Sequence, residues 1–359
     1  MENEKYCVGY NFLEATESFR EADNLEPVSL VTHATSDMMG TIEKLTNSWD
    51  GPISLGIFID SNSRNVLEYL AEVYRCDVRF RRKMTVHFAF LHKSSVSSAA
   101  NCPIIEISNS KKNCQQFFAS QDDLRTAIVG PFQNFPHNFM RNIARKGSKS
   151  DLHFLMDGDM IPSQHFAIKI KEIANRIVDG KHKKVLTIRR FETESGMDIP
   201  TDIKKLLDSK KLQRTFEFHH RYFTAGYSIE GLDEWFNKSE ESDMVTANVV
   251  PYPGYIWEIQ PILHRKDPYN ADYFPSRVKT MHALIYELCR DGYTFHVPTH
   301  VFSIHDGIQH TNTVYSKASI THQEAATMVL LVFKAFRSQN VNFELNYLDW
   351  CDTYKKFEI

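Results

Sequence analysis

The stretch "HFLMDGDMIPS", residues 153–163, places two carboxylates, Asp157 and Asp159, directly after an apolar run that is typical of a strand. Side chains two positions apart on an extended chain point the same way, so these like charges repel each other unless a cation lies between them. A hard divalent cation binds carboxylate oxygens, and Gly158 lets a backbone or a phosphate come close. The stretch therefore predicts either a metal site or a solvated acidic turn at a strand end.

Strand-like and helix-like segments alternate before this stretch. Strands are expected at residues 27–35, 52–60 and 78–91, and helices at residues 36–49, with Ser36 as N-cap, and 64–75. This order is typical of an α/β layer with a largely parallel sheet. A helix over residues 138–147, ended by Gly147, leads into a strand over residues 151–157. The acidic pair thus falls at the carboxyl end of a strand, where open α/β sheets bind ligands.

The second half of the chain is less regular. Strands are expected at residues 183–192 and 293–307, an extended aromatic segment at 249–261, and helices at 202–213, 276–292, with Gly292 as its cap, and 323–338. With 359 residues and 42% hydrophobic content, the chain can bury the core of one large domain. A formal net charge of −3 gives no general basic field, so composition supports neither a nucleic acid nor an anionic membrane as partner.

The cysteines do not form a zinc site. The six are scattered without a CxxC pair, at positions Cys7, Cys76, Cys102, Cys114, Cys289 and Cys351. Disulfides and reduced thiols fit this pattern equally well, and a bond between Cys102 and Cys114 would close a short loop. A glycosylation sequon occurs at Asn237, which matters if the chain enters the secretory pathway. The sequence contains no apolar stretch of about 20 residues and no signal-like start, so taken literally it predicts a cytoplasmic chain.

Several separate segments show recognisable motifs in a fixed order. "RNIARKG…DLHFLMDGDMIPS" resembles a "RNLAREG…DVDMVPS" pattern, "RRFE" a "PAFE" segment, "YIWEIQP" a "WEP" segment, and "ELCRDGYTFHVPTHVFSIHDG" an "ELxxxGFxFxVLxxxFLVHKG" segment. "VSLVTHAT" and "WDGPISLGIFI" resemble the opening strands of the same family, so that the likeness covers residues 27–310. These motifs are similar to those of glycosyltransferase family 49, a family of β-1,4-glucuronyltransferases and LARGE-type xylosyl- and glucuronyltransferases.

The resemblance implies an α/β, GT-A-like (Rossmann-related) nucleotide-sugar transferase domain with a mixed central sheet. It divides the chain into a peripheral lead-in, a single catalytic domain and a tail: residues 1–26, 27–345 and 346–359, with a nucleotide-binding half at 27–163, an acceptor half at 164–310 and a closing helix at 311–345. The implied reaction is inverting transfer of a sugar, glucuronate by resemblance, from a UDP-sugar to a glycan hydroxyl in O-mannosyl-type protein glycosylation. The family also implies the Golgi lumen, and a homodimer is left open.

Three residues match the metal ligands of the family. Asp157 and Asp159 match its Asp-x-Asp pair, and His305 matches the histidine of its "VH" motif. Two carboxylates with an imidazole suit Mn²⁺ better than Mg²⁺. The resemblance therefore implies a metal bound by these three side chains together with the phosphates of the UDP-sugar.

Other matching residues are expected to contact the donor. Arg141 and Asn142 match the family's "RN" pair and are placed to meet the nucleotide, and Thr32 and His33 stand where the uridine would lie. Gly158 would let a phosphate approach. Alternatively, Arg141 and Asn142 lie on an exposed helix face, and Thr32 and His33 form a polar pair at a strand end whose hydrogen bonds are made within the protein.

The acceptor residues follow from the "WE" match. Trp257 would stack on the acceptor sugar, and Glu258 would act as the general base that inverting transfer requires, with Asp272 as the second candidate. A buried Trp beside a salt-bridged Glu is the alternative.

Two departures from the family pattern favour other functions. The family's "GFN" tripeptide is replaced by Val278, Lys279 and Thr280, and the usually apolar central residue of Asp-x-Asp is Gly158. An inactive relative that binds a glycan or a partner protein would explain the lost tripeptide. A metal-dependent phosphodiesterase or nuclease is a further alternative, but it would need more acids and histidines near the acidic pair.

Overall fold

The computed structural model describes residues 6–91, 102, 113–130, 135–272 and 280–310. The predicted closing helix within residues 311–345, the predicted tail at 346–359, and Val278 and Lys279 lie outside these residues. Within the described part, no helix combines the length and the apolar character needed to cross a membrane.

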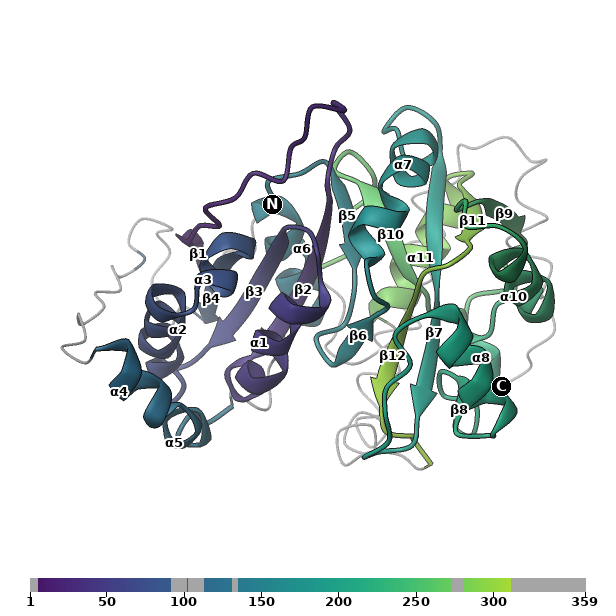
Figure 1. The fold of residues 1–359 in the computed structure, drawn as a ribbon. Coiled ribbons are helices and arrows are strands. Elements are labelled where there is room, and N and C mark those ends of the chain that lie inside the picture. The colour runs from purple at the N-terminus through teal and green to yellow at the C-terminus, as the bar shows by residue number, and fades with distance from the viewer. Residues whose placement is uncertain (1–5, 92–101, 103–112, 131–134, 273–279, 311–359) are drawn as a thin grey trace, which may run out of the picture.

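The amino-terminal half contains a parallel sheet with one antiparallel edge strand (Figure 1). Its strands are β1 (Tyr6–Leu13), β2 (Val28–Thr35), β3 (Ile53–Ile59), β4 (Met84–Leu91) and β5 (Leu152–Leu155). They lie in the order β1-β4-β3-β2-β5, and only β1 runs antiparallel to its neighbour. Every residue of β3 is buried, as expected for a strand of a parallel sheet that is covered on both faces.

Helices cover this half on both faces. They are the 3-10 turn η1 (Ser36–Met38), α1 (Met39–Ser48), α2 (Asn65–Cys76), α3 (Val78–Lys83), α4 (Cys114–Ala119), α5 (Gln121–Thr126), α6 (His137–Gly147) and α7 (Phe166–Ile177). Helix α6 packs closely on the sheet, because a Cβ at Gly56 in β3 would lie 2.8 Å from the carbonyl oxygen of Met140. It then leads into β5, as the sequence predicted.

Two local predictions in this half are wrong. Residues 78–83, predicted as the start of a strand, form α3, because the Asp77 side chain caps the backbone N–H groups of Arg79 and Phe80. Ser36 is not an N-cap, since its hydroxyl donates instead to the carbonyl oxygen of Val129 at 2.7 Å. In both places a tertiary or neighbouring side-chain contact outweighs the local pattern.

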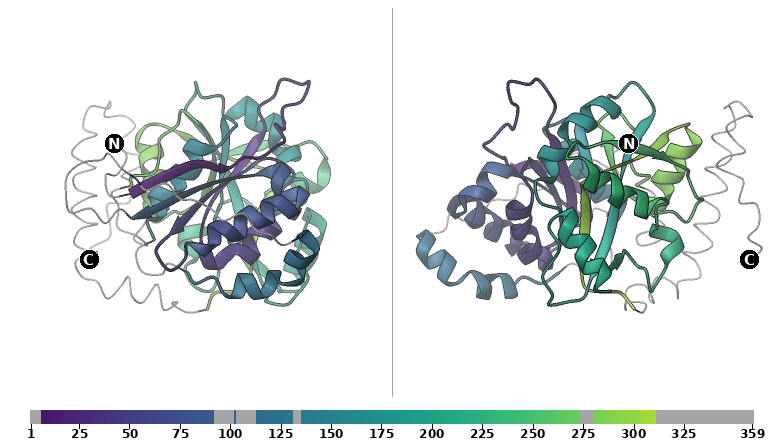
Figure 2. Two further views of the ribbon diagram at one scale, coloured as in Figure 1. Left: turned by 90° about the vertical axis from the view of Figure 1, so that its left-hand side faces the viewer. Right: turned by 45° about the vertical axis from the view of Figure 1, so that its right-hand side comes forward.

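The carboxyl-terminal half extends the sheet with mixed pairing. Its elements are β6 (Met160–Pro162), β7 (Lys184–Thr193), α8 (Ile203–Lys211), β8 (Thr215–Glu217), α9 (Thr224–Tyr227), α10 (Leu232–Glu241), β9 (Ala247–Val250), β10 (Gln260–His264), α11 (Thr280–Arg290), β11 (Thr294–Pro298) and β12 (Phe302–Asp306). Strand β10 joins the halves by pairing antiparallel with both β5 and β7. Strand β7 then pairs parallel with β11 and β12. The predicted α/β fold with a mixed central sheet is confirmed, and Figure 2 shows its twist from two further sides.

The long strand predicted at residues 293–307 is two strands. His300, at φ +68°, breaks the extended conformation between β11 and β12. The break lets the two strands pair with successive stretches of β7. Strand β11 pairs near Lys184, and β12 pairs near Glu192.

Part of the predicted lead-in belongs to the sheet. Strand β1 pairs with β4, and the Tyr6 ring stacks on Phe139 of α6 at 4.6 Å between centroids. The lead-in before residue 27 therefore adds an edge strand to the sheet, where the sequence predicted a peripheral segment.

The described cysteines are disulfide-bonded. Cys7 in β1 bonds to Cys102, and Cys76 at the end of α2 bonds to Cys114 at the start of α4. Cys289 in α11 is also disulfide-bonded. The suggested loop closure between Cys102 and Cys114 is wrong, because each bonds to a distant cysteine that the fold brings near.

We expect two buried histidines to make the fold acid-sensitive. Burial lowers the pKa of His87 from 6.5 to about 4 and that of His153 from 6.5 to about 3. Both are therefore neutral in the fold, whereas the unfolded chain binds protons below pH 6.5. The free energy of unfolding should fall by about 1.4 kcal/mol per pH unit for each histidine as the pH drops from about 6.5 toward about 4. Urea titrations at pH 7 and pH 5 would test this, and equal unfolding free energies would contradict it.

Candidate active site at the carboxyl ends of the strands

The acidic pair lies where the order of the parallel strands reverses. Strand β3 lies on one side of β2 and β5 on the other, so the loops after β2 and β5 diverge at their carboxyl ends. Such a switch point is where open α/β sheets bind ligands. Asp157 and Asp159 follow β5 directly, as the sequence predicted, and β6 begins at the next residue.

Gly158 packs against the neighbouring strand. A Cβ at this position would lie 3.1 Å from the carbonyl oxygen of His33 and 3.3 Å from side-chain atoms of Met38 and Ile42. Close contact with the end of β2 is therefore sufficient to explain the glycine. This contact also positions Asp157 and Asp159, which flank Gly158.

Asp159 and His305 form a pair suited to a divalent cation. Strands β6 and β12 place His305 opposite Met160, and the His305 Nε2 lies 3.8 Å from the Asp159 Oδ2. The His305 Nδ1 lies 2.8 Å from the carbonyl oxygen of Gly307, which can only accept, so Nδ1 carries the proton. In the neutral imidazole the Nε2 lone pair then lies on the side of Asp159, as in a metal-bound histidine. The Asp159 side chain remains 57% exposed.

Asp157 is held differently from Asp159. Its Oδ1 accepts from Arg141 at 3.0 Å, and its Oδ2 accepts from the Gln260 amide at 3.2 Å and lies 3.7 Å from the Arg190 guanidinium. Burial alone would raise the pKa of Asp157, but the two arginines hold it well below its usual range. Desolvation and the Asp157 charge raise the pKa of Asp159, while His305 opposes that rise.

The three predicted metal ligands are thus near one another but not equivalent. Within the ranges that the structure covers, no set of three or more His, Cys, Asp or Glu side chains is close enough to bind one ion. Asp159 and His305 supply an oxygen and a nitrogen that fit a divalent cation, whereas both oxygens of Asp157 are occupied by hydrogen bonds.

Of the "RN" pair, only Arg141 reaches the acidic pair. The Arg141 guanidinium also donates to Thr280 Oγ1 at 3.1 Å. Thr280, the last residue of the replaced tripeptide, therefore helps to orient Arg141. The Asn142 side chain forms two hydrogen bonds with the backbone of Asn270, at 2.7 and 3.0 Å. Asn142 therefore fixes a loop, and its amide is not directed toward the predicted nucleotide site.

Thr32 and His33 lie at the end of β2, where a nucleotide was expected. The Thr32 hydroxyl is buried and has no hydrogen-bond partner among the described groups. His33 stacks on Phe135 at 5.4 Å, and its Nε2 lies 3.3 Å from the His137 Nδ1. Burial, with a smaller effect of the Arg141 charge, lowers the pKa of His33 to about 3. His33 is therefore a neutral donor or acceptor at ordinary pH.

Glu258 lies beside the acidic pair and is connected to it by Arg190. The Arg190 guanidinium donates to the Glu258 carbonyl oxygen at 2.5 Å as well as lying near Asp157. The Glu258 carboxylate accepts from the Tyr227 hydroxyl at 2.9 Å and lies 3.5 Å from His282. The structure therefore brings the predicted base and the acidic pair into one cluster.

Asp272, the second candidate base, lies in the loop after Asn270, next to a carbonyl oxygen of Ala271 that accepts from Asn138. In the described part of the chain, no hydrogen bond or ion pair connects Asp272 with Glu258. Glu258 is thus the candidate base for which the structure shows contacts to Arg190 and Tyr227.

The structure does not support the predicted role of Trp257. Its side chain is 1% exposed and packs edge-on against Phe295 and Tyr252, at 5.2 and 6.0 Å. Its indole N–H donates to the carbonyl oxygen of Ser228. Trp257 belongs to the core of the carboxyl-terminal half, and neither face of its ring is open to a sugar.

Trp257→Ala is accordingly expected to act on stability. Removing a fully buried indole should lower the free energy of unfolding by about 3–5 kcal/mol. Urea unfolding followed by circular dichroism would measure this loss. If the variant is as stable as the wild type but binds sugar more weakly, Trp257 stacks on the acceptor sugar after all.

Several site residues were not predicted from the sequence. Gln260 contacts Asp157, Arg190 contacts Asp157 and the Glu258 carbonyl oxygen, and Glu192 is fully buried opposite His305 in the β7–β12 pair. Burial raises the pKa of Glu192. One available signal was residues 216–227, "FEFHHRYFTAGY", whose density of aromatic and histidine side chains is unusual.

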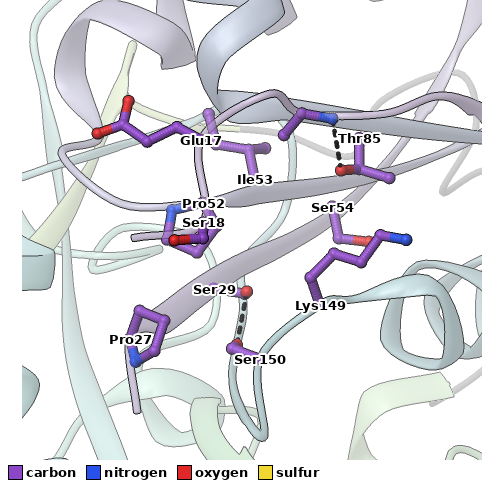
Figure 3. A pocket seen from close by; sticks show the side chains of 11 residues that line it. Glu17, Ser18, Pro27, Ser29, Pro52, Ile53, Ser54, Thr85, Lys149 and Ser150 are labelled. Carbon is purple, nitrogen blue, oxygen red and sulfur yellow. Dashed lines mark hydrogen bonds between the residues drawn. The ribbon is translucent and has the colours of Figure 1, made fainter. Parts of the chain in front are cut away.

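A small pocket occurs at the opposite end of the strands (Figure 3). It is lined by Ala15, Glu17, Ser18, Pro27, Ser29, Pro52, Ile53, Ser54, Thr85, Lys149 and Ser150. Its volume of about 20 Å³ accommodates roughly one water molecule. Hydrogen bonds such as that between Ser29 and Ser150, at 2.6 Å, occupy its polar groups. It lies at the amino ends of β2, β3 and β4, away from the acidic pair, and is too small for a nucleotide.

Comparisons with known proteins connect this chain to an enzyme family. A family model described as "Glycosyl-transferase for dystroglycan" matches residues 27–341. Beta-1,4-glucuronyltransferase 1 of Homo sapiens is 24% identical over 291 residues, covering 79% of this chain and 68% of that protein. Xylosyl- and glucuronyltransferase LARGE1 of Mus musculus is 21% identical over 216 residues, covering 60% of this chain and 23% of that protein.

Two solved structures match most of the chain, but with low similarity. The crystal structure of S. aureus TarS 1–349 in complex with UDP-GlcNAc covers 91% of this chain and 74% of its own, with a TM-score of 0.44 and 13% identity. The crystal structure of GalNAc-T7 with UDP, GalNAc and Mn²⁺ has a TM-score of 0.42 and 9% identity. The family match over most of the chain is the finding of greater weight.

Proposed function

The chain belongs to the family of glycosyltransferases for dystroglycan, and on that basis we propose that it transfers glucuronate from UDP-glucuronate to a glycan hydroxyl. The predicted resemblance to this family and the glycosyltransferase class are thereby confirmed. The names of the relatives support glucuronate as the donor sugar, and an O-mannosyl-type acceptor is a further proposal. We further propose that residues 27–345 act as one catalytic domain.

The observation that supports this function most directly is the Asp159–His305 pair at the switch point of the sheet. In the proposal these two side chains hold a divalent cation, and their oxygen and nitrogen donors favour Mn²⁺ over Mg²⁺. When bound, the metal would supply positive charge against the diphosphate leaving group. Asp157, bound by Arg141 and Arg190, keeps both guanidinium groups beside the diphosphate position.

Glu258 is the proposed general base. Inverting transfer requires a group within hydrogen-bond reach of the acceptor hydroxyl that removes its proton as the new bond forms. The Tyr227 hydroxyl and Arg190 fix Glu258 through its side chain and its carbonyl oxygen. At the donor end, the unpartnered Thr32 hydroxyl is the proposed contact for the nucleoside.

We propose the lumen of the secretory pathway, in particular the Golgi, as the compartment. Disulfides persist in oxidising compartments and are rare in the cytosol, and the described cysteines are bonded. The exposed Asn237 of the sequon lies on α10. The disulfides carry this proposal, since they would not be expected of a cytosolic enzyme, and the exposed sequon is compatible with it.

A second candidate function is a binding module without transfer activity. The engagement of both Asp157 oxygens by Arg141, Gln260 and Arg190 favours it, because one predicted metal ligand is then occupied. The exposed carboxylate of Asp159 beside His305 favours the enzyme.

A transfer assay tests the proposed function. The purified chain would be incubated with Mn²⁺, UDP-glucuronate and a panel of 4-nitrophenyl glycosides, and the products measured by mass spectrometry. We expect a glycoside heavier by one glucuronyl unit, with UDP released in equal amount. UDP-xylose, UDP-glucose and UDP-galactose in parallel reactions would identify another donor. No transfer from any donor, with no UDP release, would favour the binding module.

A further inference from the structure

Residues 216–227, here called the aromatic segment, lie between the proposed metal pair and the proposed base. The segment includes the end of β8 and all of α9. At one end, the Phe218 ring lies 5.8 Å from the His305 imidazole. At the other end, the Tyr227 hydroxyl donates a hydrogen bond to the Glu258 carboxylate. The segment therefore spans the distance over which a sugar must pass from donor to acceptor.

The inner rings of the segment are fixed in place. His219 stacks on Phe218 at 3.8 Å and meets Tyr227 edge-on at 4.6 Å. The Arg190 guanidinium lies 4.7 Å from the centres of both the Phe218 and the Tyr227 rings. A cation between two aromatic faces orders both rings, so the segment is held by the same arginine that contacts Asp157.

Phe223 differs from these inner rings because it is 40% exposed. Its ring lies over Gly226, where a Cβ would come within 2.5 Å of it. The Gly226 carbonyl oxygen in turn accepts from the Glu258 backbone N–H at 2.7 Å. Among the described residues, the large aromatic side chains that are similarly exposed are Tyr10 and Phe118, both in the amino-terminal half. Phe223 is thus an open apolar ring fixed beside the proposed base.

We propose that the aromatic segment is the acceptor site and that Phe223 stacks on a pyranose ring of the acceptor glycan. This rests on the proposed function, since it assigns the acceptor to the surface next to Glu258. A pyranose has an apolar face of C–H bonds and a rim of hydroxyls, so stacking on an exposed ring removes apolar surface from water while leaving the hydroxyls free to react. The sequence assigned this role to Trp257, whose ring is buried.

The test compares Phe223→Ala with a matched control, Phe118→Ala. Phe118 is 48% exposed on α4, so its removal deletes a similar exposed ring away from the site. We expect Phe223→Ala to raise the KM for the 4-nitrophenyl glycoside by about three- to tenfold, the range of one aromatic stacking contact. The UDP affinity should be unchanged, Phe223→Trp should restore the KM, and Phe118→Ala should behave as wild type.

Binding of the glycosides measured by saturation-transfer NMR separates this proposal from the proposed function. Glycoside signals that Phe223→Ala loses and Phe118→Ala keeps would support the acceptor site even in a chain that neither binds UDP nor transfers sugar. In that case the proposed function fails and the acceptor site remains. If Phe223→Ala binds the glycosides as tightly as the wild type does, or has the same KM, the proposal is overturned. It is also overturned if the wild-type protein binds UDP but no glycoside. Equal thermal unfolding of the variants would show that folding does not explain a loss.

Discussion

Asp159→Ala is expected to weaken Mn²⁺ binding by at least about a hundredfold and to reduce sugar transfer to background. The physical reason is that Asp159 supplies the exposed carboxylate next to the His305 Nε2, at 3.8 Å. Asp157 is a poorer replacement, because its oxygens are already engaged by Arg141, Gln260 and Arg190. Electron paramagnetic resonance of free Mn²⁺ would measure the binding directly, without depending on turnover.

The matched control for this prediction is Asp208→Ala. Asp208 is an exposed carboxylate on α8, outside the site, so its loss removes the same charge from the protein without affecting the pair. His305→Ala should resemble Asp159→Ala, since it removes the other donor. If Asp159→Ala binds Mn²⁺ as the wild type does, the metal is held elsewhere and the assignment of the pair is wrong.

Glu258→Gln is expected to lower kcat by about 10²- to 10⁴-fold, the range that a general base contributes. The amide keeps the shape and can still accept from Tyr227, but it cannot take the proton of the acceptor hydroxyl. Because the Arg190 contact is to the Glu258 carbonyl oxygen, the substitution leaves that contact intact. Binding of UDP and Mn²⁺ should therefore remain as in the wild type, and initial-rate kinetics with calorimetry would show the separation.

Asp272→Asn distinguishes the two base candidates. Asp272 lies in the loop beyond Asn270, and the described contact of Arg190 is with Glu258, so the Asp272 variant is expected to keep a kcat close to that of the wild type. A large loss of kcat in Asp272→Asn with a normal Glu258→Gln would assign the base to Asp272 instead.

The sequence was sufficient to predict the parallel half of the fold. Its buried strands, such as residues 53–59, are apolar along their whole length, and the helices between them have a clear period. The acidic pair could therefore be placed at a strand end near the switch point. By contrast, β1 and α3 were missed because the antiparallel pairing of β1 with β4 and the capping of α3 by Asp77 decide their structure, and neither contact is visible in the local pattern.

The sequence predicted only those site residues that are neighbours in the chain or that match a family motif. The partnership of Asp159 with His305 depends on the β6–β12 pairing, which the family resemblance supplied and local sequence could not. The positions of Arg190 and Phe223 depend on long-range packing around Glu258. Burial of Trp257 illustrates the same limit, because an aromatic residue next to a candidate base has the same sequence pattern whether it stacks on a sugar or fills a core.

The central claim is that the Asp157–Asp159 loop and His305 form a metal-dependent UDP site. Calorimetric titration of the wild-type chain with UDP, in the presence and in the absence of Mn²⁺, tests it most directly. We expect UDP to bind with Mn²⁺, and to bind at least about tenfold more weakly without it, because the pair then lacks the cation that links it to the diphosphate. Failure of UDP to bind under either condition, or equal binding under both, would contradict the account.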